Sequence, residues 1–303
     1  MSIKRYSAGM LLSALLALAV TDRAEAAPTP KGCAFVTGLL EKAVTPQSKV
    51  EMTEAGCHIT DVQLKKGTYQ SWMIADLSVA GLEGWDRKSK TFPSHIKLTA
   101  RGIRFFPQIG NSHTRYQIAL TQKPFDVRLD AGFDLASKQI VIRELALESP
   151  WIGHIGFEVE ASFAPDEAGG PDQPSLQDMK GGLRILHTRL VLDNRTLFEG
   201  MLMPMIIAMI PPDDDPAEVI PKWQKKAEAD LRKLPDSLVD AASRDALIRF
   251  TRDFPHPTGH FDLDIRLARP LGLGELKPGK DGNNPLKGAK LTAVYETPTA
   301  PAK

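Results

Sequence analysis

Apolar and polar residues alternate with a period of two along most of the chain between Ile59 and Phe163. The clearest run begins at Phe125, where every second residue up to position 135 is apolar. The intervening positions are Asp126, Arg128, Asp130, Gly132 and Asp134. Alternation of this kind is typical of a β-strand with one buried and one solvated face. The first half of the chain therefore predicts a run of amphipathic strands.

Short polar turns such as 136–138 separate these runs, and short connections join antiparallel neighbours. At Gly102 the apolar positions change parity, which indicates a bulge. We expect one long antiparallel meander of about eight strands, which should curl because of its size.

The pattern changes after residue 192. Residues 196–210 are almost entirely apolar and contain four of the nine methionines. Asp215 and Pro216 then form a helix start, with Asp215 as the cap, and a second helix is expected from Pro235 to about Phe254. The predicted fold class is therefore α+β: a long curled antiparallel sheet whose apolar face is covered by C-terminal helices.

The first 26 residues have the three parts of a secretory signal peptide. Lys4 and Arg5 are basic, residues 10–20 are uninterruptedly apolar, and small residues at 24 and 26 precede a cleavage site. The apolar run is too short for a membrane anchor. We expect export to the bacterial periplasm without a transmembrane anchor. The expected mature domain is 27–296, β-rich over 57–192, helical over 196–254 and closed by strands over 258–296. A disordered tail is expected over 297–303.

Cys33 and Cys57 are the only cysteines. An oxidising compartment favours a disulfide between them, and closing a loop of this size contributes about 3 kcal/mol on the chain-entropy view. They lack C-x-x-C spacing, which disfavours a redox pair or a metal site.

Charge excludes several classes of partner. Removal of residues 1–26 takes three of the 38 basic and two of the 37 acidic residues, which leaves 35 of each. A neutral chain has no long-range field for nucleic acid or anionic membranes.

No motif for nucleophilic catalysis, nucleotide binding or zinc hydrolysis is present, so we predict neither enzyme activity nor a cofactor. His260, Asp262 and Asp264 share one face of a predicted strand and are a weak candidate for a metal site. The other face of that strand is apolar, so the three polar residues also fit a solvated strand face.

The remaining candidate site is apolar. The sheet face, together with the methionine-rich segment, forms either an ordinary core or a cleft for apolar ligands, and methionine suits adaptable apolar surfaces. The predicted lining comprises Leu197, Met201, Met203, Met205, Ile206, Met209, Phe125 and Phe133.

The amphipathic strands from Ile59 to Phe163 and the strand-plus-helix unit Leu190–Phe198 resemble the AsmA-like and bridge-like proteins of bacterial envelopes. The resemblance covers about residues 57–210. It lies in the general pattern of strands and helix, and no diagnostic sequence motif is shared. It implies a curved sheet that presents an apolar face to phospholipid. The chain is short for that group and lacks its retained anchor.

From these patterns we expect a periplasmic, non-enzymatic protein that binds or carries a lipid or another apolar ligand in the cell envelope. The alternatives are an assembly or scaffold protein that docks an envelope protein, and a hydrolase with a non-local site.

Overall fold

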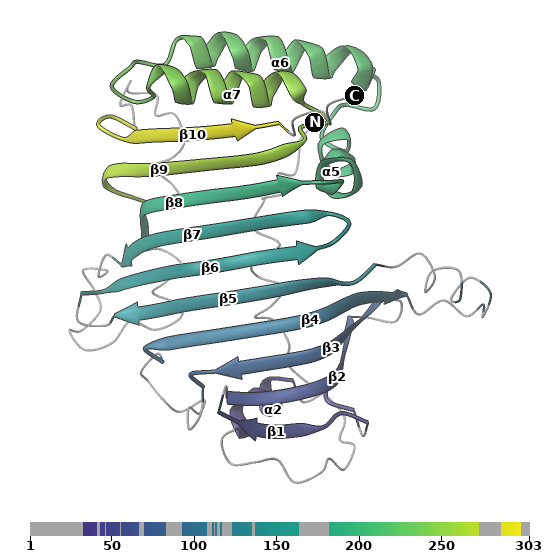
Figure 1. The fold of residues 1–303 in the computed structure, drawn as a ribbon. Coiled ribbons are helices and arrows are strands. Elements are labelled where there is room, and N and C mark those ends of the chain that lie inside the picture. Colours follow the sequence, from purple (N-terminus) through teal and green to yellow (C-terminus); the bar gives the residue numbers. More distant parts are fainter. Residues whose placement is uncertain are drawn as a thin grey trace, which may run out of the picture. The chain divides into compact units, whose positions relative to one another are not determined.

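The computed structural model describes residues 33–40, 43–45, 47–54, 56–66, 70–82, 93–107, 111, 113, 116, 123–134, 137–163, 182–272 and 286–297. Within these residues, ten strands form an antiparallel meander in which each strand neighbours the next one in sequence (Figure 1). The predicted meander is confirmed. The signal peptide over 1–26 and nearly all of the tail over 297–303 lie outside the described residues.

The strands are β1 (Val50–Thr53), β2 (Gly56–Lys66), β3 (Gln70–Ala80), β4 (His95–Pro107), β5 (Phe125–Asp134), β6 (Gln139–Ser149), β7 (Gly153–Phe163), β8 (Leu183–Asn194), β9 (Gly259–Gly272) and β10 (Lys290–Glu296). The described helices are α2 (Ala34–Leu39), the π-helix η2 (Phe198–Leu202), α5 (Met203–Ile207), α6 (Pro216–Arg232) and α7 (Ala241–Asp253).

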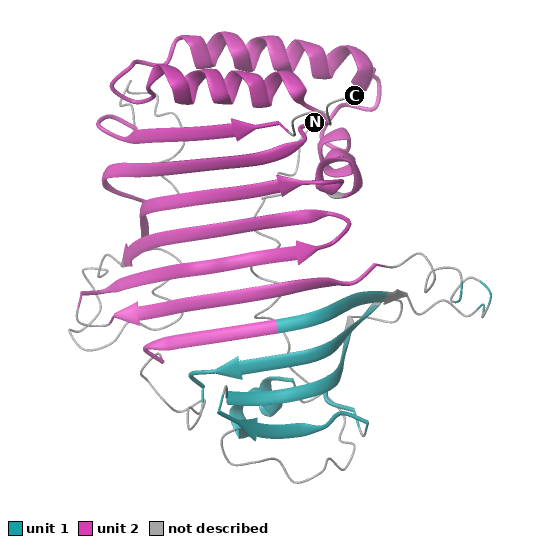
Figure 2. Ribbon diagram, in the orientation of Figure 1, with its two compact units in different colours: residues 1–87, 100–122 teal, residues 88–99, 123–303 magenta. Residues whose placement is uncertain are grey.

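The chain divides into two compact units (Figure 2). Unit 1 comprises residues 1–87 and 100–122, and unit 2 comprises 88–99 and 123–303. Strand β4 contributes residues to both units.

The predicted disulfide is present in unit 1. Cys33, at the start of α2, is bonded to Cys57 on β2 with a Cα–Cα distance of 5.2 Å. Both sulfur-bearing side chains are buried, as are Ile59 and Val62 on the same strand. At the predicted bulge, Gly102 has a φ of +64°, and a Cβ there would lie 2.9 Å from the Cβ of Ala75. The sequence therefore needs glycine at this position.

Unit 2 contains the strands with the clearest alternation. The β5 pairing with β6 runs from Asp126 opposite Glu148 to Asp134 opposite Gln139, with a register shift after Asp130. Shifts also occur in the pairings of β6 with β7, β7 with β8 and β8 with β9. Despite these irregularities, apolar residues pair with apolar residues across neighbouring strands, because a slip of one residue would turn each strand's apolar side chains to the solvated face.

The two long helices begin at acidic caps. The Asp215 carboxylate accepts a hydrogen bond from the Ala217 N–H, which confirms the predicted start of α6. The second helix begins later than expected: Asp240 caps α7 by accepting from the Ser243 N–H at 2.7 Å. Residues 235–239 instead form a turn that leads to the edge of β10, where the Leu291 N–H donates to the Leu238 carbonyl at 2.8 Å. This contact covers part of an otherwise open strand edge.

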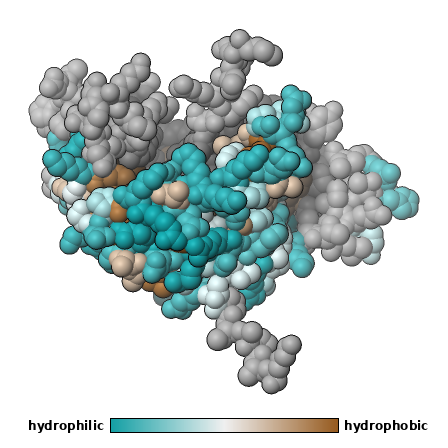
Figure 3. All heavy atoms as spheres, turned by 90° about the horizontal axis from the view of Figure 1, so that it is seen from above, coloured by the Kyte–Doolittle hydropathy of each residue, from teal (hydrophilic) through white to brown (hydrophobic). Residues whose placement is uncertain are grey.

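The helices do not cover the sheet as broadly as expected. Among the described residues, α7 lies along β10 and α6 packs on α7, while the methionine-rich α5 follows the end of β8 (Figure 1). No residue of α6 is buried. The outward surface over these helices is mainly hydrophilic, with small hydrophobic spots (Figure 3).

Candidate functional site: the apolar face of strands β5 to β10

Four rows of side chains cross the sheet of unit 2 from β5 towards β10. They follow from the strand registers, in which each residue faces a partner on the next strand. The rows are Val127, Leu147, Ile155, Leu192, Phe261 and Tyr295; Leu129, Leu145, Phe157, Leu190, Leu263 and Ala293; Ala131, Ile142, Val159, Thr188, Ile265 and Leu291; and Phe133, Ile140, Ala161, Ile185 and Leu271. Thr188 and the phenol of Tyr295 supply the only polar side-chain groups in the rows.

Burial along these rows depends on position. Phe261 and Tyr295, on the two strands nearest α7, are each 4% exposed. By contrast, Leu129, Leu145 and Phe157 on β5, β6 and β7 are only half-buried. In the first row, burial is therefore complete on β8, β9 and β10 and partial on β5, β6 and β7. The other rows mix the two, since Leu263, Ile265 and Leu291 are half-buried and Ala131, Ile140 and Ala161 are buried.

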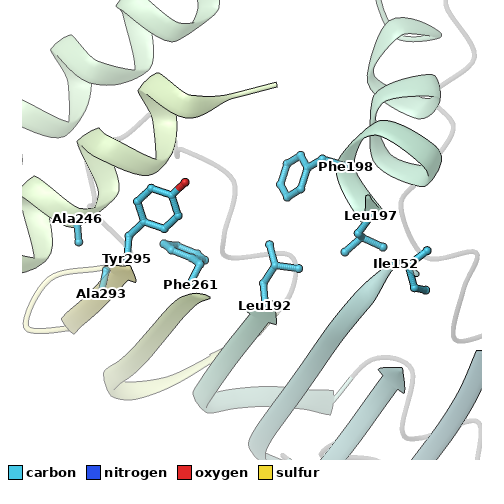
Figure 4. Close-up of a cluster of buried hydrophobic side chains, with 8 residues drawn as sticks. All are labelled: Ile152, Leu192, Leu197, Phe198, Ala246, Phe261, Ala293 and Tyr295. Carbon is cyan, nitrogen blue, oxygen red and sulfur yellow. The ribbon is translucent and has the colours of Figure 1, made fainter. Parts of the chain in front are cut away.

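A cluster of buried residues closes one end of the rows (Figure 4). It joins the sheet to α7 and to the turn that follows β8, and it comprises Ile152, Leu192, Leu197, Phe198, Ala246, Phe261, Ala293 and Tyr295. The side chain of Asn194 fixes that turn, because its oxygen accepts hydrogen bonds from the N–H groups of Leu197 and Phe198 and its nitrogen donates to the Pro257 carbonyl. The cluster is an ordinary core at this end of the sheet.

The phenol of Tyr295 is part of this closure. Its hydroxyl donates to the Asp253 carboxylate at 2.7 Å. Burial raises the pKa of the phenol, and the hydrogen bond to Asp253 acts in the same direction. The polar end of this side chain is thus satisfied at the edge of the cluster.

The opposite face of the same strands carries cross-strand ion pairs. The Arg189 guanidinium donates to Asp262 at 2.6 Å and to Glu158 at 3.1 Å. These hydrogen bonds lower the pKa of Asp262 and raise that of Arg189. Arg128 likewise bridges Glu144 and Glu148, at 2.8 and 2.6 Å. The solvated face therefore carries a network of ion pairs between neighbouring strands.

The weak candidate for a metal site, His260, Asp262 and Asp264, lies within this network of ion pairs. His260 contacts Asp193 at 2.7 Å, Asp262 pairs with Arg189, and Asp264 contacts His187 at 2.7 Å. Each member therefore has its own partner. The described residues include no group of three or more His, Cys, Asp or Glu side chains placed to hold a metal ion.

A depression of about 320 Å³ lies beside two of these residues. Its lining includes Arg189, Asp262, Asp264, Arg266 and Thr292. Two arginines and two carboxylates balance one another there, so the depression offers no net charge to a ligand.

The predicted lining residues separate into three groups. Leu197 and Met203 are buried, at 4% and 8% exposure. Phe125, Phe133 and Ile206 are half-buried. Met205 and Met209 are exposed to solvent, at 59% and 78%. The side chain of Met201 lies outside what the structure describes. The role of these residues as a ligand lining stays a prediction.

Sequence reasoning missed the residues at the end of the rows near the β6–β7 turn. Trp151 lies in this turn and packs against the buried cluster. The ammonium of Lys123 lies 5.9 Å from the centre of its ring. A Lys or Trp outside the alternating positions has no periodic signal, so only the three-dimensional pairing of the strand ends reveals this grouping.

Comparison with known proteins gives no match, whether to a family model, a curated protein or a solved structure. None of the described helices combines the length and hydropathy of a membrane-spanning segment.

Proposed function

We propose that the protein binds or carries a lipid or another apolar ligand in the bacterial cell envelope, without a catalytic step. The observation that carries this proposal is the incomplete burial of the first two apolar rows, from Val127 and from Leu129, on β5, β6 and β7. Monomeric proteins rarely leave large contiguous apolar surfaces accessible unless those surfaces bind something.

The energetics favour an apolar occupant. Removing a CH₂ group from water contributes about 0.8 kcal/mol, so a hydrocarbon chain laid across several half-buried leucine and phenylalanine side chains gains several kcal/mol. The ligand's chain and the side chains beneath it would lose their contact with water together.

Two observations support the proposed periplasmic location. The Cys33–Cys57 disulfide fits an oxidising environment. The N-terminal sequence has the features of an export signal. We therefore assign the protein to the periplasm as part of the proposal.

A docking role is the second candidate, and it rests on a different surface. Met205, Ile207 and Met209 are 59%, 44% and 78% exposed on and just after α5. Exposed apolar side chains gathered on one short segment are suited to a protein partner. On this alternative the protein is an assembly or scaffold component.

Native mass spectrometry of the protein purified from its own periplasm tests the first candidate. We expect bound lipid on the wild type. Leu145 and Phe157 face each other across β6 and β7, so Leu145→Glu and Phe157→Glu should each reduce the bound fraction. A matched control is Val294→Glu, which places the same charge on the opposite face at a side chain that is 48% exposed. A wild type without lipid, or equal loss in the control, would contradict the proposal.

A further inference from the structure

Strand β1 is the outermost strand of unit 1 and pairs with β2 on one side (Figure 1). The pairing extends one residue before β1, because the Lys49 carbonyl accepts a hydrogen bond from the Thr60 N–H at 3.0 Å. In an antiparallel pair, alternate residues direct their backbone groups to the neighbouring strand. Lys49 and Glu51 therefore direct theirs to β2, whereas Val50 and Met52 direct theirs to the other side.

The outward backbone groups of Val50 and Met52 have no hydrogen-bond partner in the described part of the chain. The edge strand of unit 2 is different, because the Leu291 N–H of β10 donates to the Leu238 carbonyl and α7 lies along that strand. An edge strand with free N–H and C=O groups can pair with a strand of another chain. Strand β1 therefore offers such an edge.

Two opposite charges flank Val50 on this edge. Lys49 and Glu51 are both exposed, and neither forms an ion pair with another described residue. Residues two apart on a strand point to the same face. The edge thus carries one positive and one negative side chain on the same face, on either side of its centre.

Three antiparallel registers pair the outward groups of β1 with those of a second copy, and they differ in charge. A two-fold axis at Glu51 places the two Glu51 carboxylates opposite each other, which is repulsive. An axis at Met52 places Glu51 opposite Thr53. An axis at Val50 places Glu51 of each copy opposite Lys49 of the other. Side chains directly opposite have Cβ atoms about 4.5–5.5 Å apart, which is within reach of an ion pair.

We propose that the protein forms a two-fold symmetric dimer, in which β1 pairs antiparallel with β1 of a second copy about Val50. In this register the Val50 N–H and C=O groups of the two copies bond to each other, and each Met52 N–H can donate to the Ser48 carbonyl of the other copy. The ladder ends there, because the Ser48 N–H already donates to the Thr45 carbonyl at 3.0 Å.

A two-fold interface uses the same surface patch of both copies, so the patch must be complementary to itself. The pair of Lys49 and Glu51 about Val50 meets this condition. Exposed ion pairs contribute little affinity, so their role is to select the register. The inference goes beyond the proposed function, because it concerns unit 1 and requires no ligand.

Sedimentation equilibrium of the purified protein over about 1–500 µM tests the dimer, since two short strands bury little surface and should give a Kd of about 10–100 µM. Lys49→Glu and Glu51→Lys each place like charges opposite one another, so each should weaken association at least about tenfold. An equimolar mixture of these two variants places opposite charges together again and should associate as the wild type does. The double variant Lys49→Glu/Glu51→Lys should also dimerise normally.

The matched control is Lys290→Glu, which reverses an exposed charge on the other edge strand and should leave the Kd unchanged. Thermal melts verify that every variant is folded. A wild type that stays monomeric over the whole range would overturn the proposal and leave the β1 edge for a strand of another protein. Normal dimerisation of the single variants, or no association in their mixture, would overturn the assigned register and interface.

Discussion

Phe250 of α7 stacks on Phe261 of β9, with ring centroids 4.1 Å apart and planes inclined by 19°. This contact fastens the C-terminal helices to the apolar face at its last strands. Tyr295 and Phe198 surround Phe250 with edge-on contacts at 5.3 and 5.8 Å. The helix is therefore an aromatic anchor at the border of the sheet, and the rows on β5 to β7 continue beyond it.

Phe250→Ala should lower the free energy of unfolding by about 2–4 kcal/mol, because a large aromatic side chain leaves a packed cluster. Trp223→Ala on α6 is the control, since that ring is 43% exposed and its loss should cost about 0.5 kcal/mol or less. Urea unfolding followed by circular dichroism measures both. A similar loss of unfolding free energy in the two variants would show that Phe250 does not anchor the helix to the sheet.

The disulfide should be complete in protein taken from an oxidising compartment. Thiol titration of the unfolded, unreduced chain should detect no free cysteine. Replacing the pair, as Cys33→Ser/Cys57→Ser, should destabilise the fold by about 3 kcal/mol, because the open chain gains conformational entropy when unfolded. Two titratable thiols in the native protein would contradict the pairing.

The strand register gives a prediction that separates the two faces. Phe133 lies in an apolar row, whereas Asp134 is exposed at the end of β5. Phe133→Asp should therefore cost several kcal/mol, since an unpaired charge enters the apolar face. Asp134→Phe should cost much less. Equal shifts of the denaturation midpoint would mean that the assigned register of β5 is wrong.

Sequence periodicity predicted the strands well because each needs only local alternation and a short turn. The run from Phe125 thus predicts β5 nearly to its last residue. The reach of the helices was not predictable in this way. The apolar faces of the helices indicate that the helices pack on another part of the protein. The sequence does not show which surface this is, because it depends on contacts between residues of different elements, such as Phe250 of α7 and Phe261 of β9.

The solvated face also shows that sequence periodicity does not reveal contacts between different strands. Alternation correctly placed His260, Asp262 and Asp264 on one side of a strand. Their partners come from β8, and only the register of β8 with β9 brings Arg189 to Asp262. A candidate metal set and a set of paired charges look identical until that register is known.

The Arg189–Asp262 pair predicts how stability depends on pH. Hydrogen bonds from Arg189 hold the pKa of Asp262 below its usual range in the folded state. The resulting stabilisation is present above the unfolded pKa, near 3.9, and is lost as the pH falls through the lower folded value.

Arg189→Gln should lower stability at pH 7 by about 0.5–1 kcal/mol, a modest figure because the arginine is partly exposed. It should also reduce the further loss between about pH 5 and pH 2. Urea midpoints across that range measure the effect, with Lys222→Gln as the control for an exposed helical pair. An unchanged acid limb in Arg189→Gln would show that this pair does not contribute.

Met203 and Met205 lie two residues apart on α5 but differ in burial, at 8% and 59% exposure. Met203→Glu should cost about 3 kcal/mol, because a carboxylate would enter a packed environment. Met205→Glu should change the thermal midpoint little and leave lipid bound, since the ligand lies on the sheet rows in our proposal. If the segment docks a protein instead, Met205→Glu should abolish recovery of that partner by cross-linking in the periplasm while the fold stays intact. Loss of bound lipid from a fully folded Met205→Glu would contradict this placement of the ligand. It would show that the methionine-rich segment contacts the ligand, which would then extend beyond the sheet.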